Sequence, residues 1–182
     1  MKPERPDPSA AAPSCQESQP RGGKRPQVDF PPILAEATRY SCGFLFTPGC
    51  PGTDVLLIRK LRPRWQAGRL NGIGGHIEYG ETPADTMRRE FLEEGGIDIA
   101  SWDPVAILRG ATFEVHFFSA WTDRVTFGSA RAMTDEQLEA IPVDNLGRDD
   151  IIPNLRVLIP LALDRSGIVK PVILQDGAPQ PH

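Results

Sequence analysis

Cysteine is scarce in this sequence, and its spacing argues against two classes of protein. The chain of 182 residues has three cysteines, Cys15, Cys42 and Cys50, with no CxxC pair among them. An odd number of widely spaced cysteines is typical neither of a disulfide framework nor of a structural zinc site. We therefore expect reduced thiols, as in the cytoplasm.

Long apolar runs and an excess of positive charge are also missing. No segment is long and apolar enough to predict a membrane span, and the beginning of the chain lacks the apolar stretch of a secretory signal. The formal net charge of -4 argues against general affinity for nucleic acids. We expect a cytoplasmic protein without membrane or nucleic-acid partners.

The two ends of the chain differ in composition from its middle. Residues 1–32 are rich in proline and poor in apolar residues, so they cannot bury enough surface to offset the entropy of ordering. We predict a disordered tail over 1–32, a single domain over 33–170 and a flexible C-terminal tail over 171–182. Apolar residues make up 40% of the chain, which is enough for one such core.

Strand-like patterns occupy much of the middle. Residues 37–47 and 54–60 are predicted strands, separated by a turn rich in proline and glycine. Residues 104–122 predict either one long bent strand or two strands, with a kink or bulge at Gly110.

A late helix is predicted over residues 151–163, beginning near Pro153. The residues expected to pack inward are Leu155, Leu158 and Ile159. Pro160 should kink or end this helix, because proline lacks the backbone N–H that a helix interior needs.

The clearest local pattern is a short helix with a signal at each end. Thr82 can cap the first turn, Pro83 suits the first helical position, and Asp85 stands where a capping carboxylate belongs. Glycines at 95–96 then end the helix, because glycine readily adopts the left-handed conformation of a C-cap. The predicted helix covers about 83–94.

This predicted helix has an apolar face and an acidic face. The residues expected on the core face are Ala84, Met87 and Phe91. The acidic face carries Glu90, Glu93 and Glu94, whose mutual repulsion costs a few tenths of a kcal/mol per pair. This repulsion has to be offset. Either the acidic face is solvated and eased by Arg88 and Arg89, or a divalent cation binds there.

A glycine-rich loop before the helix favours the cation. Residues 72–75 contain three glycines, which let the backbone approach a ligand closely. Carboxylates on a rigid helix are hard oxygen ligands of the kind that Mg²⁺ prefers, together with substrate phosphates.

These residues resemble a known signature. The segment consists of Gly75, five residues, Glu81, seven residues and then Arg89-Glu90-Phe91-Leu92-Glu93-Glu94-Gly95-Gly96-Ile97. It resembles the signature of the Nudix hydrolases, G-x5-E-x7-R-E-U-x-E-E-x-G-U, in which U is a bulky apolar residue. Every invariant position is matched, and Phe91 departs only in being aromatic where the family more often has an aliphatic residue.

The resemblance implies an α/β fold, an α/β/α sandwich around a mixed sheet, with a metal site. The implied ligands of Mg²⁺ or Mn²⁺ are Glu90, Glu93, Glu94 and the carbonyl of Gly75. Arg89 would orient a carboxylate, and Glu81 would brace the loop and helix. The implied reaction is hydrolysis of a nucleoside diphosphate linked to another moiety.

The base that activates water is less well defined. It is either Glu93, within the signature, or a carboxylate of the later loop 133–144. In that loop Glu136 is the first candidate and Asp135 the second. The structural alternative is that these are surface acids that open a short helix at Thr134.

Residues 65–81 are similar to the lead-in of MutT-like nucleoside triphosphatases, including those that clear oxidised purines. The expected substrate contacts are Arg59, Lys60, Trp65, Asn71 and Gly74. Asn71 contacts the base or caps the glycine turn, and Trp65 stacks on a base or packs. Arg59 and Lys60 reach a phosphate or are solvated at the end of a strand.

We expect hydrolysis of a (deoxy)nucleoside triphosphate to the monophosphate and pyrophosphate, in the housecleaning of damaged or surplus nucleotides. ADP-ribose or another dinucleotide is the rival substrate. A non-catalytic nucleotide-sensing module is the alternative from another class; such modules typically lose signature carboxylates, which this chain keeps. The expected partner is thus a nucleotide, and the sequence leaves open whether the chain forms a homodimer.

Overall fold

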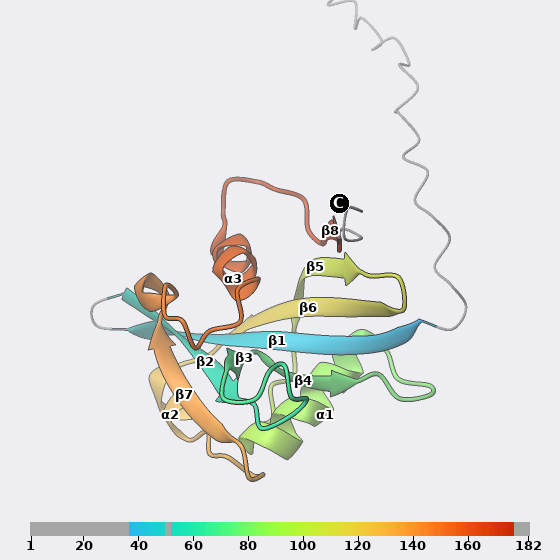
Figure 1. Ribbon diagram of the computed structural model, residues 1–182. Coiled ribbons are helices and arrows are strands. Elements are labelled where there is room, and N and C mark those ends of the chain that lie inside the picture. Colours follow the sequence, from blue (N-terminus) through green and yellow to red (C-terminus); the bar gives the residue numbers. More distant parts are fainter. Residues whose placement is uncertain (1–36, 50–51, 177–182) are drawn as a thin grey trace, which may run out of the picture. The chain divides into compact units, whose positions relative to one another are not determined.

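The computed structural model describes residues 37–49 and 52–176 (Figure 1). The tail expected over 1–32 lies outside the described residues, as do Cys15 and Cys50 and the end of the chain from residue 177. Within the described part, no helix is long and apolar enough to cross a bilayer.

A mixed sheet forms the centre of the domain. Its eight strands are β1 (Thr38–Gly49), β2 (Gly52–Arg59), β3 (Leu70–Asn71), β4 (Ile73–His76), β5 (Asp103–Arg109), β6 (Phe113–Trp121), β7 (Gln137–Pro142) and β8 (Val172–Gln175). The order along the sheet is β3-β2-β1-β6-β5-β8, with β4 paired to β1 and β7 paired to β2. The pairs β1–β6 and β5–β8 are parallel, and the other strand pairs are antiparallel.

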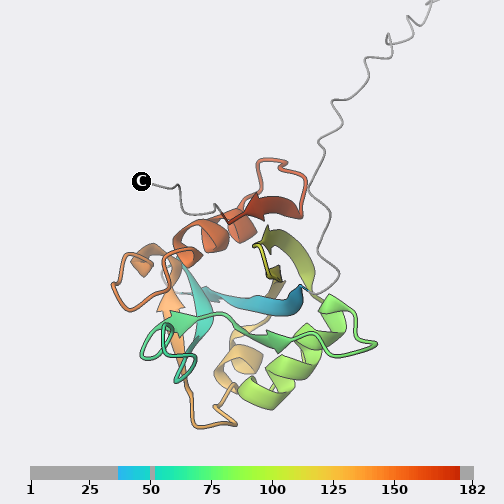
Figure 2. The ribbon, with the colours of Figure 1, turned by 45° about the vertical axis from the view of Figure 1, so that its right-hand side comes forward.

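Helices cover both faces of this sheet. They are α1 (Pro83–Gly95), α2 (Arg124–Gly128) and α3 (Leu155–Leu163), with a 3-10 turn, η1, at Val143–Asn145. Figures 1 and 2 show α1 and α3 on opposite sides of the sheet. The predicted α/β/α sandwich around a mixed sheet, in a single domain, is confirmed.

A hydrophobic core lies on each face. Strand β1 supplies both, because Phe44 and Phe46 pack with Leu155 of α3, whereas Leu45 belongs to the core that contains Phe91 of α1. Successive side chains of a strand point to opposite faces, so a strand between two helical layers is buried on both faces and mostly apolar.

The strand predictions hold with small changes at their ends. Strand β1 extends to Gly49 and β2 begins at Gly52, inside the expected turn. Residues 104–122 form two strands, which confirms the second alternative. Gly110 lies in the turn between them, where its N–H donates to the carbonyl of Phe113 (2.9 Å) rather than forming a bulge.

The late helix is confirmed as α3, which buries Leu155, Leu158 and Ile159 as predicted. Pro160 does not end it, because the helix continues to Leu163. A proline inside a helix removes one hydrogen bond. Apolar packing on both sides of Pro160, by Leu158 before it and Leu161 after it, keeps the helix continuous.

The sequence does not predict four short strands: β3, β4, β7 and β8. The expected glycine-rich loop 72–75 is wrong for most of its length, because β4 pairs there with β1. Strand β7 lies in the expected loop 133–144 and pairs with β2 from Asp54 to Arg59. Strand β8 lies in the segment 171–182 that was expected to be flexible, and pairs with β5. Both are partly exposed, so pairing with a neighbour rather than their own apolar pattern decides their structure.

Candidate active site

The acidic residues are carried by α1, whose ends form as predicted. The Thr82 hydroxyl accepts from the backbone N–H of Asp85 (3.2 Å), and the Asp85 carboxylate accepts from the N–H of Thr82 (3.2 Å). Gly96 adopts the left-handed conformation (φ 68°) that closes the C-terminal end. The two caps fix where α1 starts and stops, and hence which residues face the sheet.

The core face of α1 differs in one position from the prediction. Met87 and Phe91 are fully buried, but Ala84 is exposed. Thr86 is buried instead, and its hydroxyl donates to the carboxylate of Glu81 (2.8 Å). The packed stripe therefore begins at Thr86, while the first turn meets the sheet through the hydroxyl of Ser41, which donates to the carbonyl of Pro83 (2.8 Å).

Two glycines of β4 allow close contacts, Gly75 with α1 and Gly74 with β1. A Cβ on Gly75 would overlap the carboxylate of Glu90, with its carbon only 2.6 Å away. A Cβ on Gly74 would overlap the backbone of β1, where the Cα of Cys42 would lie at 2.8 Å. Gly75 thus leaves room for a carboxylate, and Gly74 for a neighbouring strand.

Arg89 gathers three of the signature carboxylates. Its guanidinium forms two hydrogen bonds with Glu81 (2.7 and 3.0 Å) and one each with Glu90 (2.8 Å) and Glu93 (3.1 Å). A further bond reaches the carbonyl of His76 in β4 (3.0 Å). Arg89 holds the pKa of Glu81 at about 2, well below its ordinary value. This forked arrangement braces the loop after β4 against α1.

Glu90 and Glu94 are set deeper than Glu93. Glu90 is 8% exposed, whereas the side chain of Glu93 is 57% exposed. Burial raises the pKa of both Glu90 and Glu94, and the positive charges of Arg89 and Lys60 oppose this rise. Oε2 of Glu94 is buried without any hydrogen-bond partner. Two partly desolvated carboxylates close together favour binding of a cation.

Glu136 joins the site from the position just before β7. It is 6% exposed, and its carboxylate accepts from Lys60 Nζ (2.6 Å) and from the N–H of Leu61 (2.7 Å). The alternative of surface acids at the start of a short helix is wrong for Glu136, because the strand β7 follows it. Asp135 is exposed and pairs only loosely with Arg62 (3.5 Å).

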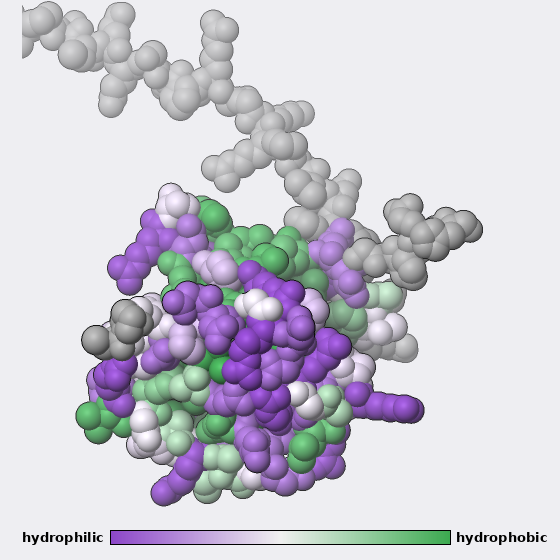
Figure 3. Space-filling model, turned by 60° about the vertical axis from the view of Figure 1, so that its left-hand side comes forward, coloured by the Kyte–Doolittle hydropathy of each residue, from purple (hydrophilic) through white to green (hydrophobic). Residues whose placement is uncertain are grey.

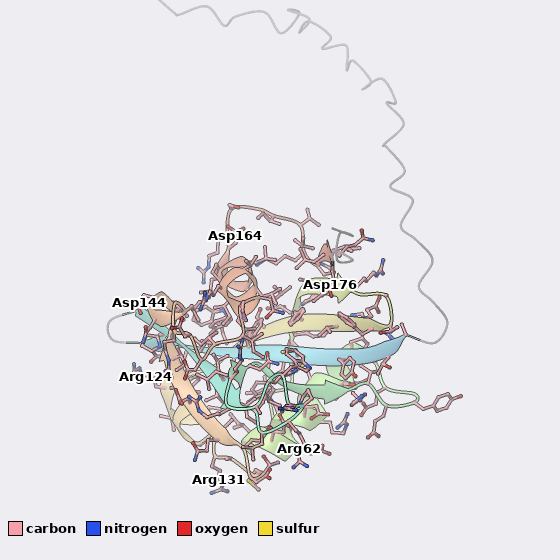
Figure 4. The ribbon with its side chains drawn as sticks, viewed as in Figure 1. Arg62, Arg124, Arg131, Asp144, Asp164 and Asp176 are labelled. Carbon is pink, nitrogen blue, oxygen red and sulfur yellow. The ribbon has the colours of Figure 1, made fainter. Side chains whose placement is uncertain are left out.

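A cavity of about 220 Å³ opens between these elements. Its lining residues are Lys60, Arg62, Glu94, Thr134, Asp135 and Glu136. In Figure 4 Arg62 lies in the lower part of the view, on the side of the sheet that carries α1. The cavity therefore connects the acidic face of α1 with the start of β7.

These residues fit a divalent cation, although no group of three histidine, cysteine or carboxylate side chains among the described residues already surrounds one point. Lys60 and Arg89 occupy the carboxylates of Glu94 and Glu90. The unpartnered oxygen of Glu94, and the space beside Glu90 that the missing side chain of Gly75 leaves, are what a metal with oxygen ligands needs.

Arg59 lies outside this cavity. It binds the carboxylates of Glu139 and Asp150, and Arg148 binds the same two residues. Arg59 is thus paired rather than solvated, and its contact with a phosphate stays a prediction. Figure 3, which turns the side of β2 and β7 forward, shows a broad hydrophilic area over these elements. No sequence motif predicts that Glu139 and Asp150 bind Arg59, since these partners are distant in sequence.

Two other expected substrate contacts differ in their surroundings: Trp65 is exposed, and Asn71 is hydrogen-bonded within its own loop. Trp65 is 67% exposed, so the packing alternative is wrong and its ring is accessible. The side-chain oxygen of Asn71 accepts from the N–H of Gly72 (2.8 Å), and its amide donates to Gln66 (3.0 Å). Asn71 thus caps the glycine turn.

Cys42 is a free, buried thiol next to this turn, and burial raises its pKa to about 12, so it stays protonated.

The fold and this site define a class: an α/β sandwich with a capped acidic helix behind a glycine loop. The model of the NUDIX domain matches residues 43–161, and the chain belongs to this family. It is similar to two proteins named oxidized purine nucleoside triphosphate hydrolase. The one from Mus musculus is 36% identical over 104 residues, 53% of this chain and 66% of that protein. The one from Danio rerio is 31% identical over 114 residues, 56% of this chain and 69% of that protein.

Solved structures with the same fold are more distant in sequence. A mutT/nudix family protein from Listeria innocua has a TM-score of 0.56 at 18% identity, covering 69% of this chain and 91% of that one. The NUDIX domain of Shewanella oneidensis NrtR, solved in complex with ADP ribose, has a TM-score of 0.57 at 14% identity and covers 74% and 92%. These two structures support the fold alone.

Proposed function

We propose that this chain is a pyrophosphohydrolase, dependent on Mg²⁺ or Mn²⁺, that converts a nucleoside triphosphate to the monophosphate and pyrophosphate. The observation that carries this proposal is the placement of Glu90, Glu93 and Glu94 on one helix, with Glu90 against Gly75, in a chain of the NUDIX family. The names of the mouse and zebrafish relatives support oxidised purine nucleotides as the substrate class. Clearing such nucleotides is a housecleaning role, which we place in the cytoplasm.

The metal would be held by the carboxylates of Glu90, Glu93 and Glu94 and the carbonyl of Gly75. When bound, a divalent ion neutralises phosphate charge and lowers the pKa of water, which is the chemistry that phosphoric anhydride hydrolysis needs. Arg89 keeps the carboxylates of Glu90 and Glu93 oriented, and Glu81 fixes Arg89 in turn. These two residues act as positioning residues.

Water attacks phosphorus, the anhydride P–O bond breaks, and pyrophosphate leaves, so a base has to accept the proton of the water. Glu136 and Glu93 are the two candidates. Glu136 borders the cavity and is held at one oxygen by the N–H of Leu61, so its other oxygen can take a proton once Lys60 moves away. Glu93 is more exposed, which suits a ligand at the edge of the site.

The base of the nucleotide would stack on Trp65, whose ring is exposed. The second N–H of the Asn71 amide remains a donor for a base, since the first donates to Gln66. Gly74 contributes indirectly, by letting β4 lie against β1.

A turnover screen tests the proposal. The full chain is incubated with Mg²⁺ and canonical or 8-oxo purine triphosphates, ADP-ribose, NADH or dinucleoside polyphosphates, with and without EDTA. We expect release of pyrophosphate from one triphosphate, abolished by EDTA. Preference for ADP-ribose would keep the metal site and replace the substrate. Binding of nucleotides without any turnover would identify a sensing module and refute the enzyme.

A further inference from the structure

Lys60 lies deep among the acids of the cavity. Its side chain is 14% exposed, and its ammonium donates to Glu136 (2.6 Å) and to Glu94 (3.4 Å). Its backbone is fixed as well: the N–H donates to the carbonyl of Arg69 (2.9 Å), and the carbonyl accepts from Gly68 (2.8 Å). The ammonium therefore stands in a defined place between two carboxylates, Glu94 of α1 and Glu136 just before β7.

A divalent ion bound to Glu94 would compete with this ammonium. Lys60 uses Oε1 of Glu94, while the buried Oε2 of the same carboxylate has no partner. A cation that enters at Oε2 lies within a few ångströms of the lysine charge. Like charges at such a distance repel in a partly desolvated site, so a bound metal drives the ammonium away from Glu94.

We propose that Lys60 is the built-in counter-ion of the metal-free site, and that metal binding displaces it. Displacement also releases Oε2 of Glu136, whose Oε1 stays anchored by the N–H of Leu61. Loading of the metal and exposure of the candidate base are then one event, and the metal-free protein holds this base masked. The inference rests on the proposed metal site and adds a regulatory role for Lys60.

The test measures metal affinity, without substrate, by calorimetric titration of the full chain with Mn²⁺. A unit charge a few ångströms from a divalent ion changes its affinity by about tenfold even at the dielectric of water. Lys60→Met is therefore expected to bind Mn²⁺ at least about tenfold more tightly than wild type. Lys60→Arg keeps the charge and should bind within about threefold of wild type.

Matched controls separate this inference from the proposed function. Lys170→Met changes a lysine that donates to backbone carbonyls of Ala162 and Asp164, and should leave affinity unchanged. Glu94→Gln removes a proposed ligand and should abolish tight binding. Equal or weaker Mn²⁺ binding by Lys60→Met, with Glu94→Gln impaired, would overturn only the role of Lys60. Normal binding by Glu94→Gln would overturn the metal site itself.

A measurement on the wild type covers the case in which Lys60→Met does not fold. The chain has four lysines, so a ¹⁵N spectrum of labelled lysine ammonium groups is simple to assign. The hydrogen-bonded Lys60 signal, identified by its loss in Lys60→Arg, should disappear or shift as Mg²⁺ saturates the site. A signal that does not change during the titration would overturn the proposal.

Discussion

Gly75→Ala should impair metal binding and activity while leaving the fold stable. Gly74→Ala should instead lower the stability of the fold. A Cβ on Gly75 meets the end of a flexible side chain, the carboxylate of Glu90. A Cβ on Gly74 meets the backbone of Ser41 and Cys42, which cannot move unless β4 separates from β1. The two substitutions are neighbours and identical in chemistry, so each is the control of the other.

The magnitudes follow from what has to move. Turning Glu90 into another rotamer costs about 1 kcal/mol but breaks its bond with Arg89 and removes a proposed ligand from its place. Misplacing a residue that supports a metal site typically lowers activity by about 10- to 100-fold. Overpacking against the backbone at Gly74 should destabilise the fold by about 2 kcal/mol or more, which corresponds to a melting temperature lower by roughly 4–8 °C.

Thermal unfolding, Mn²⁺ affinity and kcat/KM, measured on both variants, check this reasoning. We expect Gly75→Ala to melt within a few degrees of wild type, at roughly 2–4 °C per kcal/mol, with impaired metal binding and activity. Full activity in Gly75→Ala would show that the carboxylate of Glu90 need not occupy its observed place. Wild-type stability of Gly74→Ala would show that β4 does not need glycine to reach β1.

Four further outcomes are expected. Glu93→Gln should lower kcat by orders of magnitude without loss of stability, because its side chain is 57% exposed; normal turnover would exclude it as ligand and base. Arg89 lowers the pKa of Glu81 from 4.5 to about 2, so the pair stabilises the fold above about pH 4.5 and less as the pH falls toward 2. The stability gap between wild type and Glu81→Gln should therefore be widest near neutral pH and close in acid, as followed by thermal melts. Arg59→Met should lower stability by about 1–3 kcal/mol in denaturant titrations, with kcat little changed, because its partners are carboxylates rather than substrate. Trp65→Ala should raise KM for the nucleotide and leave the melting temperature unchanged, since the ring is exposed.

Local patterns predicted α1 well, because caps and the periodicity of a helix depend on nearby residues. The start at Pro83, the capping box and the left-handed Gly96 all formed as expected. Ala84 was placed wrongly on the core face, since helical periodicity alone does not show that Thr86 takes the buried place and binds Glu81. Strands β7 and β8 were missed because their structure depends on pairing with distant neighbours.

The charged partners were harder to predict than the helix. Lys60 and Glu136 are 76 positions apart, and Arg59 and Asp150 are 91 apart. Spacing along the chain carries no signal for such pairs, so both cations were expected to be solvated or to bind phosphate. The carboxylates of the signature were predicted as a group because a single helix turn brings them together.

The parallel pairing of β1 with β6 has a consequence for how the chain folds. Thr38 lies opposite Phe113 and Phe46 opposite Trp121, so the central strand of the sheet gains its second long neighbour only after most of the domain has been synthesised. Pairings this distant in sequence are typical of slow folding. Until β6 arrives, one edge of an apolar strand is open to pairing with other chains. We therefore expect nascent chains shorter than about 120 residues to aggregate or to require a chaperone.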